Sequence, residues 1–305
     1  MQEKYEKCFF FIADYHSLTT HPDAKELPEN VKRALSTYLG CGLDPEKCVL
    51  YKQSDIPQTA ELYLILNMFA YKGELEKVST FKDKIRQKNQ TVNAGLLTYP
   101  VLMAADIIIH KASSVPVGKD QEQHLEMSRT FAQRFNHTYN QEYFPLPKAV
   151  SLSKELVKIP SLSGEGKMSK SDANPNNAIY LDDENDLIIK KIKKAKTDSG
   201  PTEKNSPISP ELENLLQLMH YVSSPETIAT TIDQYKSCTI RYGDLKKQLG
   251  EDMVAFIEPI RERINRIYKD DDYLYDIGKK GAEQAAASAS KTIDEVRSII
   301  GINSY

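Results

Sequence analysis

Cys8-Phe9-Phe10-Phe11-Ile12-Ala13 is an unbroken apolar run near the start of the sequence. A strand that is apolar on both of its alternating faces is typical of a parallel sheet covered on both sides. Residues 31–39 then carry apolar side chains at helical spacing, and Gly40 stands where that helix would end. The opening of the chain therefore predicts a buried strand followed by an amphipathic helix.

The same alternation continues along the first half of the chain. The sequence predicts a strand at 48–53, a helix at 60–71, a strand at 115–117 and a helix at 121–135. Residues 101–110 are apolar enough for either a buried helix or a strand, and their periodicity does not separate the two. Strands that alternate with helices indicate an α/β fold with a Rossmann-like, doubly wound parallel sheet.

The second half of the chain is expected to form an all-helical domain. Strand patterns fade after residue 182, and helices are predicted over 184–196, 210–222, 225–235, 244–268 and 273–300. The segment 141–181 is rich in Pro, Ser, Gly and Asn, which is typical of loops. At roughly 100–200 residues per domain, the length of 305 residues suggests two domains, which we place at 1–181 and 182–305.

Composition narrows the class of protein. The net charge of −3 argues against unselective nucleic-acid binding, although the lysine run at 190–196 is either a local basic patch or a solvated helix face. Four cysteines without a C-x-x-C pair disfavour a disulfide framework or a zinc site and suit a reducing cytosol. No apolar run reaches the ~18 residues of a transmembrane helix, and the N-terminus does not read as a signal peptide. We therefore expect a cytoplasmic protein with no membrane association and no resident metal.

The strongest motif is Lys167-Met168-Ser169-Lys170-Ser171, which follows Ser161–Gly166. A glycine-flanked loop with two lysines and two hydroxyls can close over a triphosphate and neutralise a departing pyrophosphate. Taken alone, such a pentamer could also be an ordinary exposed loop or a phosphorylation-like patch. This one resembles the signature loop of the class I aminoacyl-tRNA synthetases.

The second motif is Thr98–Asp106, followed by Val115–Gln121. Asp106 stands between apolar runs, where a carboxylate is costly unless hydrogen bonds satisfy it. Taken alone, it could be a helix-end or buried structural aspartate. Together the two segments resemble the tryptophanyl-tRNA synthetase family, in which the matching aspartate accepts the indole N–H. Because indole offers one donor and no acceptor, a single buried acceptor in an apolar pocket is the simplest site that can recognise it.

The resemblance covers most of the chain and implies a set of amino-acid-binding residues. Weaker matching segments are Thr197–Ser199, Arg241–Lys246 and Gly281–Ala285. Beside Asp106, the residues implied in tryptophan binding are Tyr99, Met103, Val115, Val117, Gln121 and His16. His16 follows the strand at 8–13, and ligands of open α/β sheets bind at the carboxyl ends of strands. A packing role for His16 stays open.

The resemblance also implies an ATP site. The implied residues are Gly118, Lys119 and Asp120 at the ribose, Ile159 at the adenine, and Lys167, Met168, Ser169, Lys170 and Ser171 at the phosphates. Many family members carry an acid where Lys119 stands. Lys82 and Lys84 match a basic loop near the phosphates, but paired surface lysines are common. ATP would enter as a substrate with Mg²⁺.

The implied reaction is the ATP-dependent attachment of L-tryptophan to its tRNA through tryptophanyl-adenylate, with release of AMP and pyrophosphate. Residues 1–181 would form the catalytic domain and 182–305 the domain that binds the tRNA anticodon. Family members are typically homodimers, so we expect one here.

One family feature is missing from the sequence. Family members begin with a strand, a glycine-containing turn and a helix with a His/Thr-Ile/Leu-Gly-Asn motif, where a helix N-terminus holds the phosphates. No such segment precedes Cys8. We expect this difference to expose strand edges and to impair the activity.

Three other interpretations of the sequence are weighed against this one. A tyrosine–tRNA ligase shares the fold and the loop, but its pocket usually carries a tyrosine–aspartate pair because a phenol both donates and accepts. A non-catalytic paralogue that binds tryptophan or RNA would have little need of the Lys167–Ser171 loop. A nicotinamide-dependent dehydrogenase would need a G-x-G-x-x-G turn, which the sequence lacks.

Overall fold

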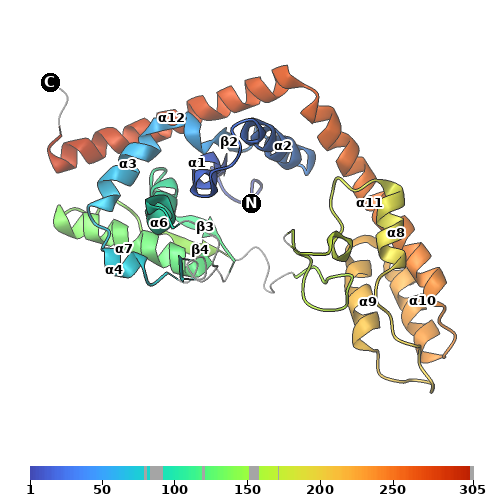
Figure 1. Cartoon of the computed structure of the whole chain (residues 1–305). Helices are drawn as coiled ribbons and strands as arrows, with labels where there is room; N and C mark the ends of the chain where they lie inside the picture. The colour runs from blue at the N-terminus through green and yellow to red at the C-terminus, as the bar shows by residue number, and fades with distance from the viewer. Residues whose placement is uncertain (79–80, 83–91, 119–120, 151–157, 171, 303–305) are drawn as a thin grey trace. The chain divides into compact units, whose positions relative to one another are not determined.

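The computed structural model describes residues 1–305 except 79–80, 83–91, 119–120, 151–157, 171 and 303–305 (Figure 1). The chain forms two compact units. The first unit combines Met1–Lys154 with Ile267–Tyr305, and the second is Glu155–Arg266. Among the described residues, no helix combines the length and the apolar character of a membrane-spanning segment.

The first unit contains two pairs of parallel strands. β1 (Phe9–Ile12) pairs with β2 (Val49–Lys52), and β3 (Ser114–Pro116) pairs with β4 (Lys148–Val150). α2 (Glu26–Gly40) connects β1 to β2, as the sequence predicts. Within the described ranges the two pairs remain separate two-stranded sheets. The parallel α/β character is thus confirmed, while the sheet is divided between β1 and β3.

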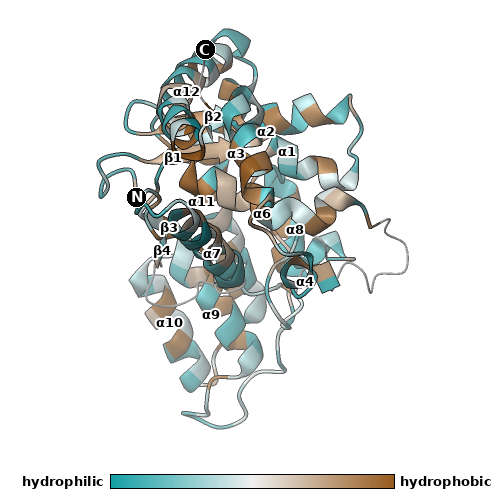
Figure 2. Ribbon diagram, turned by 90° about the vertical axis from the view of Figure 1, so that its left-hand side faces the viewer, coloured by the Kyte–Doolittle hydropathy of each residue, from teal (hydrophilic) through white to brown (hydrophobic). Residues whose placement is uncertain are grey.

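The helices of the first unit surround these strands. Besides α2, the helices whose bounds the structure describes are α1 (Asp14–Ser17), α3 (Pro57–Asn67), α4 (Lys72–Leu75), α6 (Ala94–Ile108), α7 (Glu122–Thr138) and α12 (Asp271–Ile300). The ambiguous stretch 101–110 is helical as far as Ile108, and the Asn93 side chain caps this helix by accepting from the Leu96 N–H at 2.8 Å. Brown, apolar residues gather around β1 and α3 in Figure 2, whereas α7 shows a largely teal face. The core of the unit lies between these helices and the strands.

The second unit is a helical bundle with its own core. Its helices are α8 (Asn185–Lys193), α9 (Pro210–Val222), α10 (Pro225–Lys236) and α11 (Tyr242–Tyr268), which continues to the boundary with the first unit. Ser209 and Ser224 cap α9 and α10 through their side-chain oxygens, and a proline follows each cap at the first helical position. These helices agree with the sequence prediction to within a few residues.

The compact units do not coincide with the predicted division at 181/182. The loop before α8 belongs to the second unit, because Leu162 is buried in its core and the Asn214 amide donates to the Ser161 carbonyl oxygen at 2.7 Å. The last helix belongs to the first unit, because α12 packs against β2 and α3. Local sequence patterns identify these segments correctly but carry no information about the partner on which each one packs.

The contact between α12 and β2 depends on Gly281. A Cβ atom at this position would overlap the carbonyl oxygen of Leu50, so the helix backbone lies directly on the strand backbone. Leu274 and Ile277 on the same helix are buried with Leu50 in one apolar cluster. The glycine therefore sets how closely the last helix approaches the strand.

We predict that Gly281→Ala destabilises the chain by about 3 kcal/mol or more, because the methyl group displaces backbone rather than a flexible side chain. Gly278→Ala is the matched control on the same helix, where an added Cβ meets nothing within 4 Å. Removing the backbone entropy of that glycine should stabilise the chain by about 0.5–1 kcal/mol. Urea unfolding followed by circular dichroism measures both, and equal effects of the two variants would contradict this account of the contact.

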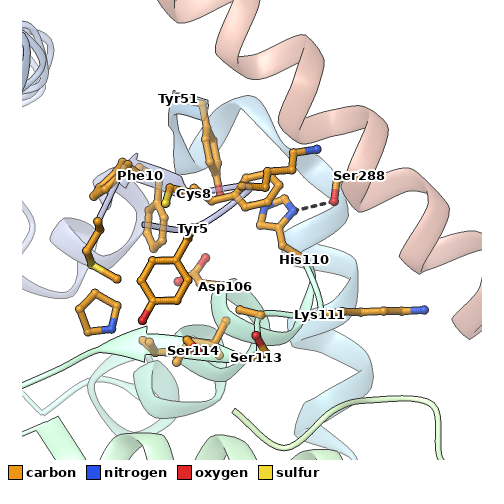
Figure 3. A pocket seen from close by; sticks show the side chains of 18 residues that line it. Tyr5, Cys8, Phe10, Tyr51, Asp106, His110, Lys111, Ser113, Ser114 and Ser288 are labelled. Carbon is orange, nitrogen blue, oxygen red and sulfur yellow. Dashed lines mark hydrogen bonds between the residues drawn. The ribbon is translucent and has the colours of Figure 1, made fainter. Parts of the chain in front are cut away.

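His110, just after α6, joins three elements of the first unit (Figure 3). Its ring stacks on Phe9 with centroids 3.9 Å apart, its Nε2 lies 3.0 Å from the Tyr51 hydroxyl, and its Nδ1 lies 3.1 Å from the Ser288 hydroxyl. Burial lowers the pKa of His110 to about 4. The neutral imidazole is therefore the form that the fold stabilises.

This burial predicts a specific loss of stability in acid. In the unfolded chain His110 binds a proton below about pH 6.5, whereas in the folded chain it binds one only near pH 4. The free energy of unfolding therefore falls as the pH drops through this window. At pH 5 the loss should be about 2 kcal/mol relative to pH 7. Urea unfolding at both pH values should show a smaller difference for His110→Gln than for the unaltered chain. His137→Gln, at an exposed position, should keep the full difference.

Candidate active site

Asp106 is the most buried acid of the first unit's candidate site, with 7% of its surface exposed. The Gln53 amide nitrogen donates to both carboxylate oxygens at 2.8 and 2.9 Å. His16 Nε2 lies 2.9 Å from Oδ2 of the same carboxylate. His16 stands after β1 and Gln53 directly after β2, so the carboxylate is held at the carboxyl ends of two neighbouring strands.

The electrostatics of Asp106 reflect a balance of burial and hydrogen bonding. Burial raises the pKa of this carboxyl, while His16 and Gln53 oppose the rise. A carboxylate offers about four lone-pair directions, and the three contacts from Gln53 and His16 use three of them. As far as the described residues show, this leaves capacity for one further N–H donor at a buried acceptor.

Tyr99 lies on the same helical face as Asp106, seven residues earlier on α6. Its hydroxyl is 3.1 Å from Nε2 of His124, a buried residue of α7. Its ring meets the His16 ring edge to face, with centroids 6.4 Å apart. The structure therefore brings together three of the residues that the sequence implicates: His16, Tyr99 and Asp106.

Gln53 and His124 are not among the residues that the sequence predicts for the site. Like His16, Gln53 is a polar side chain at the carboxyl end of a buried strand, and this position was the signal that could have identified it. Gln53 is only 1% exposed, so its amide has to be satisfied inside the fold. His124 carries no comparable signal, because the helical pattern of α7 gives it no special position.

A mostly apolar cavity of about 340 Å³ lies between β1 and β3 (Figure 3). Asp106 and Val115 line it together with Phe9, Phe11 and His110. The other predicted indole-pocket residues, Tyr99, Met103 and Val117, are not among those that line this cavity. Met103 and Val117 pack against the same core as Val115, and Tyr99 packs against a cluster that includes Phe81. The cavity thus collects only part of the predicted pocket.

The predicted ATP residues of the first unit are only partly described. Gly118 accepts a hydrogen bond from the Gln121 N–H at 2.9 Å, which places Gln121 at the start of α7. Lys82 is exposed. Lys84, Lys119 and Asp120 lie outside the described residues.

The lysine-rich loop belongs to the second unit. Pro160 and Lys167 form an antiparallel bridge, and the Met168 N–H donates to the Ile159 carbonyl oxygen at 2.8 Å. The turn between them needs glycine, because Gly164 and Gly166 have φ values of 80° and 71°. These contacts hold Ile159 beside the start of the motif, so the residues predicted for adenine and for phosphate are neighbours.

The two lysines of the motif are free for a ligand. Lys167 and Lys170 are exposed, and neither has an ion-pair partner among the residues that the structure describes. Met168 is half-buried against the helical core and accepts a hydrogen bond from the Ile179 N–H at 3.5 Å. Ser171 lies outside the described residues. Among the described residues, the loop therefore presents two unpaired cations on either side of a methionine that packs against the helical core.

No metal site accompanies these groups in the described part of the chain. None of its groups of three or more His, Cys, Asp or Glu side chains could hold a metal ion. The described residues offer a buried acceptor in the first unit and exposed cations in the second.

Comparison with known proteins agrees with this chemistry. The family described as class I tRNA synthetases (W and Y) matches residues 1–258. The tryptophan–tRNA ligase of Porphyromonas gingivalis is 54% identical over 302 residues, which cover 99% of this chain and 91% of that protein. The tryptophan–tRNA ligase of Clostridium acetobutylicum is 38% identical over 303 residues, covering 99% and 89%.

Solved structures with a similar fold include members of the same family. The tryptophanyl-tRNA synthetase of Campylobacter jejuni, in complex with ADP and tryptophan, superposes with a TM-score of 0.88 at 34% identity, covering 98% of this chain and 91% of that one. A tyrosyl-tRNA synthetase from Aeropyrum pernix is 18% identical with a TM-score of 0.59, which indicates a shared fold alone. With the family match extending over most of its length, the chain belongs to the class I tRNA synthetases of the tryptophan and tyrosine group.

Proposed function

We propose that this chain is a tryptophan–tRNA ligase, which joins L-tryptophan to its tRNA at the expense of ATP. The observation that carries the amino-acid specificity is the buried Asp106 carboxylate, on which the described residues leave one acceptor direction unused. The 54% identical relative supports the same substrate. A tyrosine substrate is not favoured, since the similarity to tyrosyl enzymes is confined to the fold.

In the first step, the tryptophan carboxylate attacks the α-phosphorus of ATP. The bond from that phosphorus to the bridging oxygen breaks, and pyrophosphate leaves with the electron pair. Lys167 and Lys170 would neutralise charge on the departing pyrophosphate, with Ser169 and Ser171 shaping the loop. Mg²⁺ would enter with the nucleotide, and we assign no protein ligand to it.

In the second step, a ribose hydroxyl of the terminal tRNA adenosine attacks the acyl carbon of tryptophanyl-adenylate. The tryptophanyl group moves to the hydroxyl oxygen, and AMP leaves. Neither step needs a protein nucleophile, so the contribution of the chain is positioning and charge stabilisation. Gly118, Lys119, Asp120 and Ile159 would hold the nucleoside, and Lys82 and Lys84 would add charge near the phosphates.

Amino-acid selection would rest on the first unit. Asp106 would accept the indole N–H, and a site built around a buried acceptor rejects analogues that leave it unsatisfied. Tyr99, Met103, Val115 and Val117 would form the apolar wall. His16 and Gln121 would serve the amino acid's polar end.

Two wider expectations complete the proposal. Residues 1–181 would supply the catalytic functions and 182–305 the anticodon contacts, in a cytoplasmic homodimer. The family resemblance supports the dimer, and the molar mass of the purified chain in solution tests it.

The first experiment is tryptophan-dependent exchange of labelled pyrophosphate into ATP, with tyrosine as the competing substrate. The chain contains no tryptophan, so the fluorescence of added tryptophan reports binding in the same samples. Exchange with tryptophan, together with charging of its tRNA, is the expected result. Exchange with tyrosine alone would overturn the substrate, and tryptophan binding without exchange would favour a non-catalytic paralogue.

We predict that Asp106→Ala lowers kcat/KM for tryptophan in the exchange reaction by about 10²-fold, the equivalent of about 3 kcal/mol. Asp106→Asn keeps a carbonyl acceptor and should lose less. Because burial raises the pKa of Asp106, the activity of the unaltered chain should fall at a higher pH than an ordinary carboxyl would allow, and Asp106→Asn should lack that limb. Asp294→Ala, at an exposed acid of α12, is the control. A comparable loss in the control would contradict the assignment.

Lys170→Ala should lower kcat for exchange by about 10²-fold while the dissociation constant for tryptophan stays nearly unchanged. The reason is that the lysine would stabilise charge that develops on the phosphates during reaction. Lys204→Ala, an exposed lysine of the same unit, should leave both quantities intact. Loss of tryptophan binding in Lys170→Ala would show a structural role instead.

A further inference from the structure

The end of α8 concentrates positive charge. Residues 187–197 contain five lysines and no acidic residue. Two of these lysines are engaged: Lys191 is buried and donates to Asp183 at 2.6 Å, and Lys196 lies 3.8 Å from two glutamates. The other three are Lys190, Lys193 and Lys194. They are exposed, and within the described chain their side chains form no hydrogen bond or ion pair.

These three lysines share one side of the helix. They stand at positions i, i+3 and i+4, where Cβ atoms are about 5–6 Å apart. Like charges at this spacing repel each other and weaken the helix by a few tenths of a kcal/mol. An anion from outside the chain would relieve that repulsion, since no described acid forms an ion pair with any of the three.

The helix dipole does not offset this charge. The Lys246 ammonium donates to the Ala195 carbonyl oxygen at 2.7 Å and reaches the Lys193 carbonyl oxygen at 3.4 Å. The partial negative charge at the C-terminal end of α8 is therefore met by a lysine from α11. The three exposed ammonium groups remain available to another molecule.

A polar pocket of about 210 Å³ opens beside this face. Lys194 lines both the pocket and the helix face, which makes the two features continuous. The remaining lining residues are Leu162, Ser163, Asn174, Asn176, Asn177 and Lys196. Hydroxyl and amide groups both donate and accept, so they suit a ribose hydroxyl or a phosphate oxygen.

We propose that this surface, formed by Lys190, Lys193, Lys194 and the pocket, binds the sugar–phosphate backbone of RNA. It deepens the proposed function and rests on it, because the RNA would be the tRNA substrate. Flexible lysines act as point charges without reading bases, and no aromatic residue stands among the described lining residues of the pocket to stack on one. The contact should therefore strengthen binding without selecting a sequence.

The test compares two double charge reversals in the full chain. Lys190→Glu/Lys194→Glu alters the proposed surface, and Lys204→Glu/Lys236→Glu makes the same charge change at two other exposed lysines of the second unit. Three quantities are measured: binding of fluorescently labelled tRNA, tryptophan-dependent pyrophosphate exchange, and KM for tRNA in charging. Binding is followed from about 50 to 200 mM salt.

We expect the first variant to weaken tRNA binding and raise KM for tRNA by about tenfold or more, and to make the salt dependence shallower by about two phosphate contacts. Pyrophosphate exchange should stay within about twofold, because it needs no tRNA. Equal tRNA binding by the two variants would overturn the proposal, and would leave an acidic protein as the alternative partner of this face. Failure of the proposed function gives a different result, because the unaltered chain would then show no pyrophosphate exchange. The comparison of tRNA binding by the two variants would still test whether this surface binds RNA.

Discussion

The first unit depends on keeping one carboxylate out of water. Desolvating Asp106 is unfavourable unless donors replace the lost water, and those donors are Gln53 and His16. Each donor follows a different strand, so the carboxylate is satisfied only when β1 and β2 pair in their observed parallel register. The hydrogen bonds that support the proposed ligand site are thus the same ones that tie α6 to the strand ends.

A second constraint closes the unit from far along the chain. α12 lies against β2 at Gly281, and Arg297 near its end forms a two-nitrogen ion pair with Glu61 of α3 at 2.6 Å. Such partners are more than two hundred residues apart, so the strand reaches its final packing only after the whole second unit has been made. His110 adds to the same closure by linking Tyr51 to Ser288.

The sequence was sufficient wherever a local pattern determines local structure. The apolar run at 8–13 predicts β1, because a strand buried on both faces is apolar at every position. The helical spacing at 31–39 predicts α2, because a helix buried on one face repeats its apolar residues with the helical period. The stretch 101–110 was ambiguous because a helix buried on most sides has no polar face to reveal its period. The contact of Gln53 with Asp106 and the packing of α12 could not be predicted, because tertiary packing determines the partner of a side chain and no local period encodes it.

Placing the two kinds of chemistry in separate compact units has a consequence for selection. Asp106 draws its hydrogen bonds from the first unit, while the Lys167–Ser171 loop is held by Ile159 and by the helical core of the second. The two sets share no hydrogen-bond partner among the described residues. With the proposed roles of Asp106 in amino-acid selection and of the loop in phosphate binding, a change in the hydrogen bonds of one need not break those of the other, which would account physically for a shared loop in enzymes that select different side chains.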